Sequence, residues 1–185
     1  KARRERRWII FMDESGVTQK PSIRRTWAPT GKTPVIVHAF NLQKLSVAAA
    51  LGYRWDGKRS RLFFQTKPGS YDTAGLIGFL QEFKKERPGR KCLLIWDGLP
   101  AHKSKLMQAH LHTQRHWLAV EKLPAYAPDL NPVELIWGNV KGQELANLCA
   151  ADLTEVGREL RRGLNRITAN RILPHSFLRH TGLLL

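Results

Sequence analysis

The sequence has no long hydrophobic run: none of its 185 residues belongs to an apolar stretch of about 18 or more. A helix that crosses a bilayer needs about 20 such residues, so no membrane span and no membrane partner are expected. No secretory signal pattern is visible either. The sequence therefore predicts a soluble protein.

Cysteine is scarce, with Cys92 and Cys149 as the two instances. Two cysteines, one of which opens an apolar run, do not make a disulfide framework. Proteins without such frameworks are typical of reducing compartments. We therefore expect an intracellular protein, in the cytoplasm or nucleoid if the source is bacterial.

Acidic residues are outnumbered: 15 Asp and Glu stand against 31 Lys and Arg, for a net charge of +16. The positive charge is spread along the chain rather than confined to a tail. An excess of this size indicates a polyanionic partner, with nucleic acid far ahead of a membrane surface. The length suits one domain over residues 1–185, in which the charged run 1–7 is expected to be a linker remnant.

Two short, continuous apolar runs each end at an acidic residue. Trp8–Met12 is followed by Asp13, and Cys92–Trp96 is followed by Asp97. Such runs are typical of strands that are buried on both faces of a sheet. Side chains alternate along a strand, so Asp13 and Glu14 point to opposite faces and only one of them can enter a given site. We expect that residue to be Asp13, with Glu14 as a weaker rival.

The rest of the pattern predicts a mixed α/β sheet covered by helices. Three antiparallel and two parallel strands are expected, with helices at the C-terminal end. In such sheets the ligand crevice lies beyond the carboxyl ends of the strands, where Asp13 and Asp97 are placed. Beyond the two runs above, strands are expected over residues 35–40, 45–51, 61–65 and 117–123, and helices over residues 71–86, 99–111, 132–147 and 151–168.

A third acid, Glu134, lies in the first turn of a predicted helix, after Asn131 as N-cap and a proline at the first helical position. Glu134 has two interpretations: it completes a capping box with Asn131, or it joins Asp13 and Asp97 in one site. Three convergent carboxylates suit a pair of Mg²⁺ ions, which activate a nucleophile and stabilise a leaving oxygen in phosphodiester chemistry. Asp129 is a further rival, but its position two residues before the N-cap predicts a turn.

Basic residues surround an aromatic side chain in the turn-rich segment 17–34. Its arginines and lysines can grip a phosphate backbone while Trp27 stacks on a base; equally, Trp27 can pack into the core under a surface loop. His102, five residues after the second acid, could meet a phosphate, order the site or pack at the start of a helix. The residues assigned to DNA contact are Arg24, Arg25, Trp27, Lys32, His102, Lys103 and Lys141.

Two distinctive motifs surround the second and third acids. Residues 95–103 are Ile-Trp-Asp-Gly-Leu-Pro-Ala-His-Lys, and residues 123–137 are Leu-Pro-Ala-Tyr-Ala-Pro-Asp-Leu-Asn-Pro-Val-Glu-Leu-Ile-Trp. These segments resemble the DDE catalytic domain of IS630/Tc1/mariner transposases, and residues 13–16 and 24–31 fit the same pattern. The resemblance covers about residues 8–145, and the 36 residues between Asp97 and Glu134 are close to the short spacing that this superfamily uses.

The resemblance implies an RNase H-like fold and metal-dependent cutting of DNA at transposon ends, followed by attack of the freed 3′-OH on target DNA, typically at TA dinucleotides. By the same match Asp13, Asp97 and Glu134 are the catalytic acids and the ligands of two Mg²⁺ ions, which Mn²⁺ can replace. Such transposases carry an upstream helix-turn-helix region that binds transposon ends, and we expect no such region within residues 1–185. A homodimer is a candidate for the active assembly.

Two other functions stay open at this point. One is a hydrolytic nuclease on the same fold, which would cut DNA without joining strands. The other is a catalytically silent DNA-binding module, such as a domesticated transposase that uses only its basic surface.

Overall fold

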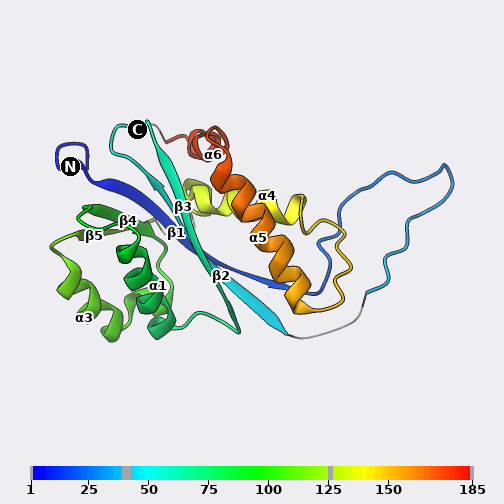
Figure 1. Cartoon of the computed structure of the whole chain (residues 1–185), viewed down its shortest axis with the longest axis horizontal. Helices are drawn as coiled ribbons and strands as arrows, with labels where there is room; N and C mark the ends of the chain where they lie inside the picture. Colours follow the sequence, from blue (N-terminus) through cyan, green and yellow to red (C-terminus); the bar gives the residue numbers. More distant parts are fainter. Residues whose placement is uncertain (1, 39–42, 125–126, 184–185) are drawn as a thin grey trace.

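A five-stranded mixed sheet forms the centre of the molecule in the computed structural model, which describes residues 2–38, 43–124 and 127–183 (Figure 1). The strand order is β3-β2-β1-β4-β5, with β2 antiparallel to β1 and β3, and β4 parallel to β1 and β5. This arrangement confirms the predicted combination of three antiparallel and two parallel strands. The strands are β1 (Trp8–Thr18), β2 (Lys44–Tyr53), β3 (Ser60–Pro68), β4 (Cys92–Trp96) and β5 (Leu118–Lys122).

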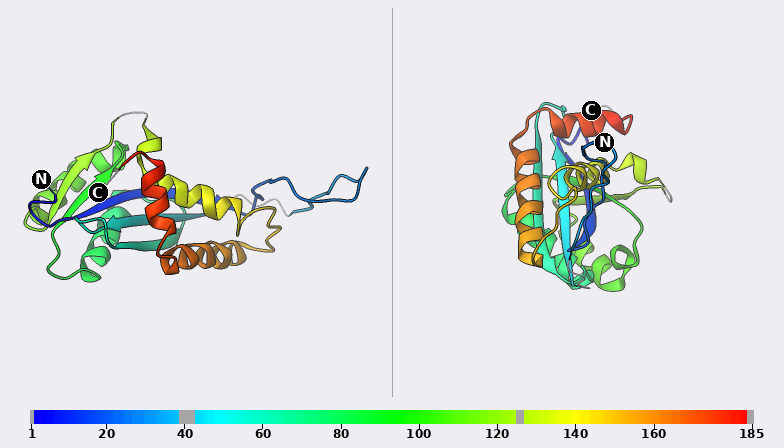
Figure 2. Two further views of the ribbon diagram at one scale, coloured as in Figure 1. Left: turned by 90° about the horizontal axis from the view of Figure 1, so that it is seen from above. Right: turned by 90° about the vertical axis from the view of Figure 1, so that its right-hand side faces the viewer.

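Helices cover both faces of this sheet (Figure 2). One apolar core lies between the sheet and α4, α5 and α6, and a second lies between the opposite face and α1 and α3. None of the helices in the described ranges is long and apolar enough to cross a membrane. The helices are α1 (Thr73–Lys85), α2 (Pro100–Lys103), α3 (Lys105–Gln114), the 3-10 turn η1 (Pro128–Leu130), α4 (Pro132–Gly142), α5 (Leu153–Ala169) and α6 (Leu173–His180).

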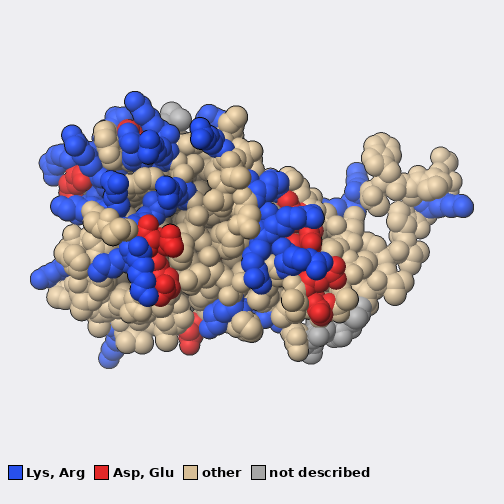
Figure 3. Space-filling view, viewed as in Figure 1, with Lys and Arg blue, Asp and Glu red and all other residues tan. Residues whose placement is uncertain are grey.

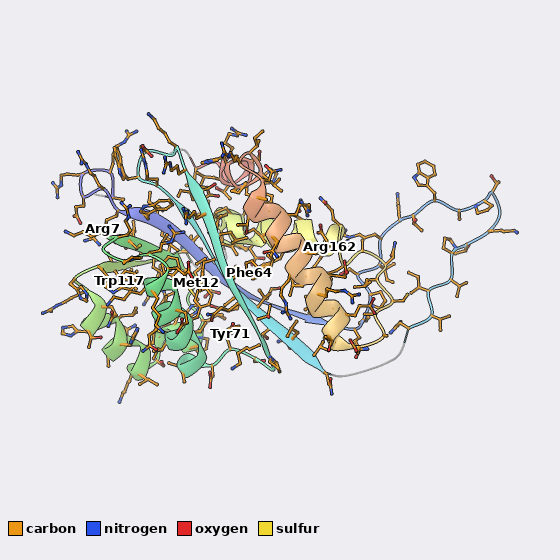
Figure 4. The ribbon with its side chains drawn as sticks, in the orientation of Figure 1. Arg7, Met12, Phe64, Tyr71, Trp117 and Arg162 are labelled. Carbon is orange, nitrogen blue, oxygen red and sulfur yellow. The ribbon has the colours of Figure 1, made fainter. Side chains whose placement is uncertain are left out.

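Strand β1 supplies side chains to both cores in strict alternation. Ile9 and Phe11 lie in the core under α4, while Ile10 and Met12 lie in the core under α1; Met12 is labelled in Figure 4. The predicted alternation is therefore confirmed. It places Asp13, the next residue in the first series, on the face covered by α4.

The same strand is longer than expected. The prediction that it ends at Met12 is wrong, because pairing with β2 continues from Asp13, opposite Ala49, to the end of the strand. Pairing with β4 ends at Phe11. Asp13 therefore lies inside β1 but just past the end of its parallel neighbour, at the edge where β4 gives way to a loop.

Residues 19–24 still lie against the body, where Ser22 pairs with Ala146 and the Arg24 N–H donates to Oδ1 of Asn147 at 2.8 Å; residues 25–38 form an extended loop that leaves it (Figure 1, Figure 2). The strand predicted over residues 35–40 is wrong for its described part, in which Val35 and Val37 are 83% and 82% exposed and pair with no described strand. A run of β-branched residues forms a strand only where a neighbour can pair with it. Residues 39–42, which hold the end of that predicted strand and part of the predicted turn after it, lie outside the described residues.

The helices also differ from prediction in three ways. The helix predicted over residues 99–111 is broken at Ser104, which has extended backbone angles and accepts the Met107 N–H at 3.2 Å as the N-cap of α3. The next helix, α4, ends at Gly142 rather than near residue 147, because the Leu145 N–H turns back to the Val140 carbonyl. Helix α6 was not predicted. The remaining predicted elements are confirmed.

Candidate active site

Asp97 lies in the loop that follows β4, as predicted. Its Oδ1 accepts a hydrogen bond from the Leu99 N–H at 3.1 Å and lies 2.8 Å from Nδ1 of His102. The Asp97 side chain is 42% exposed. The loop and the start of α2 therefore orient this carboxylate while leaving much of it open to a ligand.

Asp13 is buried, with 8% of its surface exposed. Its Oδ2 accepts a hydrogen bond from Nε1 of Trp137 at 2.7 Å. Burial raises the pKa of the Asp13 carboxyl to about 7; the Trp137 hydrogen bond opposes this rise, and the charges of Glu134 and Glu14 add to it. The negative charges of two other acids repel this buried carboxylate, and a bound cation would offset that repulsion.

Glu134 is exposed in the first turn of α4, after the predicted N-cap. Asn131 Oδ1 accepts the Val133 N–H at 3.2 Å, which confirms the cap. A capping box would need the Asn131 N–H to reach Glu134, but this N–H donates to the Pro128 carbonyl at 2.8 Å. The geometry therefore favours a site acid over a capping box.

These three acids open onto one cavity of about 520 Å³. Asn131 connects the α4 side of the cavity wall to β1, because Nδ2 of Asn131 donates to the carbonyl of Met12, the residue before Asp13, at 3.4 Å. Lys103 lines the same cavity and is its one basic side chain among the described residues. Strand β1, the loop after β4 and the start of α4 thus deliver the carboxylates predicted from sequence to a common hollow.

Carboxylate oxygens are the ligands that Mg²⁺ and Mn²⁺ prefer, so the donor set of this cavity fits such ions. In the present side-chain positions, no group of three His, Cys, Asp or Glu among the described residues is close enough together to hold one ion. A shared ion would therefore draw the exposed carboxylates of Asp97 and Glu134 towards buried Asp13.

His102 is buried, with 2% of its surface exposed, and stacks on Trp96 at 4.1 Å between ring centroids. Its Nδ1 faces Asp97, and its Nε2 lies 3.4 Å from Oε1 of Glu14. Burial alone would lower the pKa of His102, but the hydrogen bond and charge of Glu14, with the contribution of Asp97, raise it above the ordinary value. Of the three roles considered for His102, ordering the site fits this position, and Glu14 is engaged on the opposite face of β1 from Asp13.

The basic residues assigned to DNA contact lie in two separate places. Arg25, Trp27 and Lys32 lie on the extended loop and Arg24 at its base, away from the acids, and Trp27 is 99% exposed, which excludes packing into the core. Lys103 and Lys141 lie near the acids. The ammonium group of Lys141 donates to Oγ of Ser15 at 3.0 Å, two residues beyond Asp13 on β1.

The sequence matches one family model over most of its length. Residues 8–156 match the DDE superfamily endonuclease family. The chain belongs to this family. A comparison with curated proteins gave no match.

Solved structures of the Mos1 mariner transposase share the fold of this DDE endonuclease. A Mos1 paired end complex with Mn has a TM-score of 0.64 at 17% identity, over 94% of this chain and 51% of that chain. The Mos1 strand transfer complex gives 0.58 at 17% identity (96% and 55%), and the isolated Mos1 catalytic domain gives 0.52 at 14% (96% and 83%). The likeness confirms the expected RNase H-like fold. The chain spans about half the length of the first of these transposase chains.

One contact in the site of this DDE endonuclease escaped the sequence analysis: the hydrogen bond from Trp137 to Asp13. Trp137 lies in the core, with 4% of its surface exposed. A buried indole N–H usually finds an acceptor, so a tryptophan three residues after Glu134 was a signal that could have been used.

Proposed function

We propose that this DDE endonuclease is the catalytic domain of a DNA transposase, which cuts DNA at transposon ends and joins the freed 3′-OH to target DNA. The observation that carries the proposal is the single cavity onto which Asp13, Asp97 and Glu134 open. The net charge of +16 supports a DNA substrate. The related fold of Mos1 has been solved in a paired end complex and in a strand transfer complex.

Asp13, Asp97 and Glu134 would hold two Mg²⁺ ions, or Mn²⁺ in their place. When bound, the ions supply charge neutralisation, activation of the attacking water or 3′-OH, and stabilisation of the leaving 3′ oxygen. The Mos1 paired end complex has been solved with Mn and with Mg. Divalent ions therefore suit both the donor set of this cavity and the structures that share its fold.

Neighbouring residues hold the carboxylates of Asp13 and Asp97 in position. The Trp137 indole fixes one oxygen of Asp13 and leaves the other for a ligand. His102 fixes Oδ1 of Asp97 and leaves the other oxygen for a ligand. Stacking on Trp96 of β4 holds the His102 imidazole in the plane that this contact needs. Lys103 contributes positive charge at the rim, where the reacting phosphate would lie.

DNA outside the reacting phosphate would be held by the remaining basic residues. Lys141 lies beside β1 close to the acids, Arg24 lies at the base of the loop, where its backbone is bonded to Asn147, and Arg25, Trp27 and Lys32 project on the loop. End-specific recognition is assigned to an upstream domain outside residues 1–185. The active assembly is proposed to be a homodimer inside the cell.

The test of the proposal is strand joining with a pre-cut duplex that carries a free 3′-OH, in Mg²⁺ or Mn²⁺. Asp97→Asn is expected to lower joining by at least about a thousandfold, because one metal-ligating charge is lost. Asp129→Asn is the matched control: this acid is exposed in η1 at the edge of the site, and its removal should leave joining within about twofold of wild type.

The outcomes separate the candidate functions. Joining by Asp97→Asn at the wild-type rate would refute the assignment of the acids. Metal-dependent cutting without joining would instead support a hydrolytic nuclease. DNA binding with neither activity would support a silent binding module.

A further inference from the structure

A second basic surface lies at the end of the molecule opposite the acids. It is formed by three segments: the N-terminal turn 2–7, the hairpin that joins β2 to β3, and the connection from α1 to β4. Figure 3 shows Lys and Arg gathered over the first two of these segments, at the upper left of the view. We call this surface the basic pole; its exposed members are Arg3, Arg4, Arg6, Lys58, Arg59, Arg61, Arg90 and Lys91.

Short contacts hold the three segments of the basic pole together. The guanidinium of Arg6 lies over the Trp55 ring of the hairpin, 5.9 Å from its centroid. Arg7 donates from Nη1 to the Cys92 carbonyl at 3.2 Å, and the Trp8 N–H donates to the Lys91 carbonyl at 2.9 Å. The basic side chains are therefore gathered by the fold and are not a product of one charged run.

The positive charge of the basic pole is not neutralised locally. Glu5 and Asp56 are engaged by Arg7 and Arg54, and none of the eight exposed members forms an ion pair with a described acid. Burial lowers the pKa of Arg87, which lies beneath the surface. The charges of Arg61 and Arg90 lower this pKa further, whereas Cys92 and Glu86 raise it. Cations crowded in this way attract an anion.

Helix α5 gives the contrasting case. Its exposed face also carries arginines, but Arg158 and Arg162 each form ion pairs with Glu155 or Glu159 within the helix. Figure 3 accordingly shows red side chains among the blue ones there. High basic content alone therefore does not distinguish the basic pole; the lack of acidic partners does.

The aromatic residues of the basic pole favour a duplex over a single strand. Binding of single strands depends on aromatic faces that are open to bases. Here Trp55 is contacted by Arg6 and Arg54, and Arg87 lies 4.6 Å from the centroid of the Trp8 ring. What remains exposed is an array of guanidinium and ammonium groups, which contact the phosphates of a duplex without reading its sequence.

The basic pole is distinct from the catalytic cavity. It surrounds the amino ends of β1 and β4, whereas Asp97 follows the carboxyl end of β4. Strand β4 has five residues, so at about 3.3 Å per residue the two sites are roughly 15 Å apart along the sheet. Phosphates bound at the basic pole are therefore not the phosphate that reacts.

We propose that the basic pole is a second DNA-binding surface, which holds the phosphate backbone of duplex DNA independently of sequence and of divalent metal. The choice of DNA among polyanions rests on the proposed function. The surface would hold a flanking or second duplex while the acids act on another phosphate.

The test is the affinity of the 185-residue chain for a duplex of arbitrary sequence, measured by fluorescence anisotropy in EDTA at several salt concentrations. The variant combines Arg4→Gln, Arg59→Gln and Arg61→Gln, one exposed residue from the N-terminal turn and two from the β2–β3 region. The matched control combines Arg158→Gln, Arg161→Gln and Arg162→Gln on α5, which removes the same charge far from the basic pole (Figure 4). Circular dichroism and thermal melting verify that both variants fold.

The basic-pole variant is expected to weaken duplex binding by about tenfold or more at low salt. It should also reduce the slope of log Kd against log salt by up to about 2.7, since each lost phosphate contact contributes about 0.9. The α5 control should stay within about twofold of wild type. An unstructured single strand of the same length, used as a second probe, should lose less affinity than the duplex.

Equal losses in the two triple variants would overturn the proposal, because net charge rather than this surface would then explain them. A larger loss for the single strand than for the duplex would overturn it as well. Neither result depends on catalysis, because binding is measured in EDTA, where the proposed metal-dependent activity is absent. Failure here is therefore distinguishable from failure of the proposed function.

Discussion

Replacing Asp13 by Asn should stabilise the metal-free protein while removing its metal-dependent activity. The pKa of this buried carboxyl is raised from 3.8 to about 7, chiefly by burial, so ionisation costs the folded state free energy that the unfolded state does not lose. Asn keeps the shape and can still accept the Trp137 N–H. The substitution therefore removes the cost of the charge and keeps the contact.

The size of this effect depends on pH in a defined direction. With the pKa raised in the folded state, that state binds more protons than the unfolded state between about pH 4 and pH 7, so wild-type stability falls as pH rises through this window. A shift of about three units corresponds to up to about 4 kcal/mol by pH 8 and less than about 1 kcal/mol near pH 4. The gain from Asp13→Asn should therefore be about 3 kcal/mol larger at pH 8 than at pH 4.

Thermal unfolding in EDTA at the two pH values measures this difference directly. For a chain of this length, a difference of about 3 kcal/mol corresponds to a Tm difference of roughly 6–12 °C. Asp129→Asn, an exposed acid, is the control and should change neither Tm by more than about 1 °C. If Asp13→Asn lowers the Tm at pH 8, or shifts it equally at both pH values, the account of the buried carboxyl is refuted.

Two further predictions concern the surroundings of the site and the core. Trp137→Phe keeps an aromatic side chain but loses the indole N–H that donates to Asp13, so the affinity for Mn²⁺ should fall about 10–100-fold in calorimetric titration; unchanged affinity would show that the bond does not position the acid. In thiol titration Cys149, which is exposed, should react in the native protein, whereas Cys92, whose pKa burial raises to about 11, should react only after unfolding; rapid reaction of both would contradict the packing around β4.

Much of the fold could be predicted from sequence where local signals agreed. The apolar run before Asp97, bounded by turn residues, predicted β4, and the pair Asn131 and Pro132 predicted the start of α4 and with it the place of Glu134. These features depend on a few neighbouring residues, so nothing distant had to be known.

The errors arose where a partner elsewhere in the chain decides the outcome. Asp13 looked like the end of a strand, but the facing alanines of β2 extend the ladder past it. Val35 and Val37 have strand propensity yet meet no described strand. The bond from Trp137 to Asp13 depends on how α4 lies across β1, an angle that no local pattern contains.

The central claim is that three acids from three separate elements form one metal site. Crystals soaked with Mn²⁺ and measured for anomalous scattering test it most directly, because the result needs neither a transposon end nor turnover. The account predicts one or two peaks among Asp13, Asp97 and Glu134, with Trp137 still bonded to Asp13. An empty cavity between carboxylates that stay apart under saturating Mn²⁺ would contradict it.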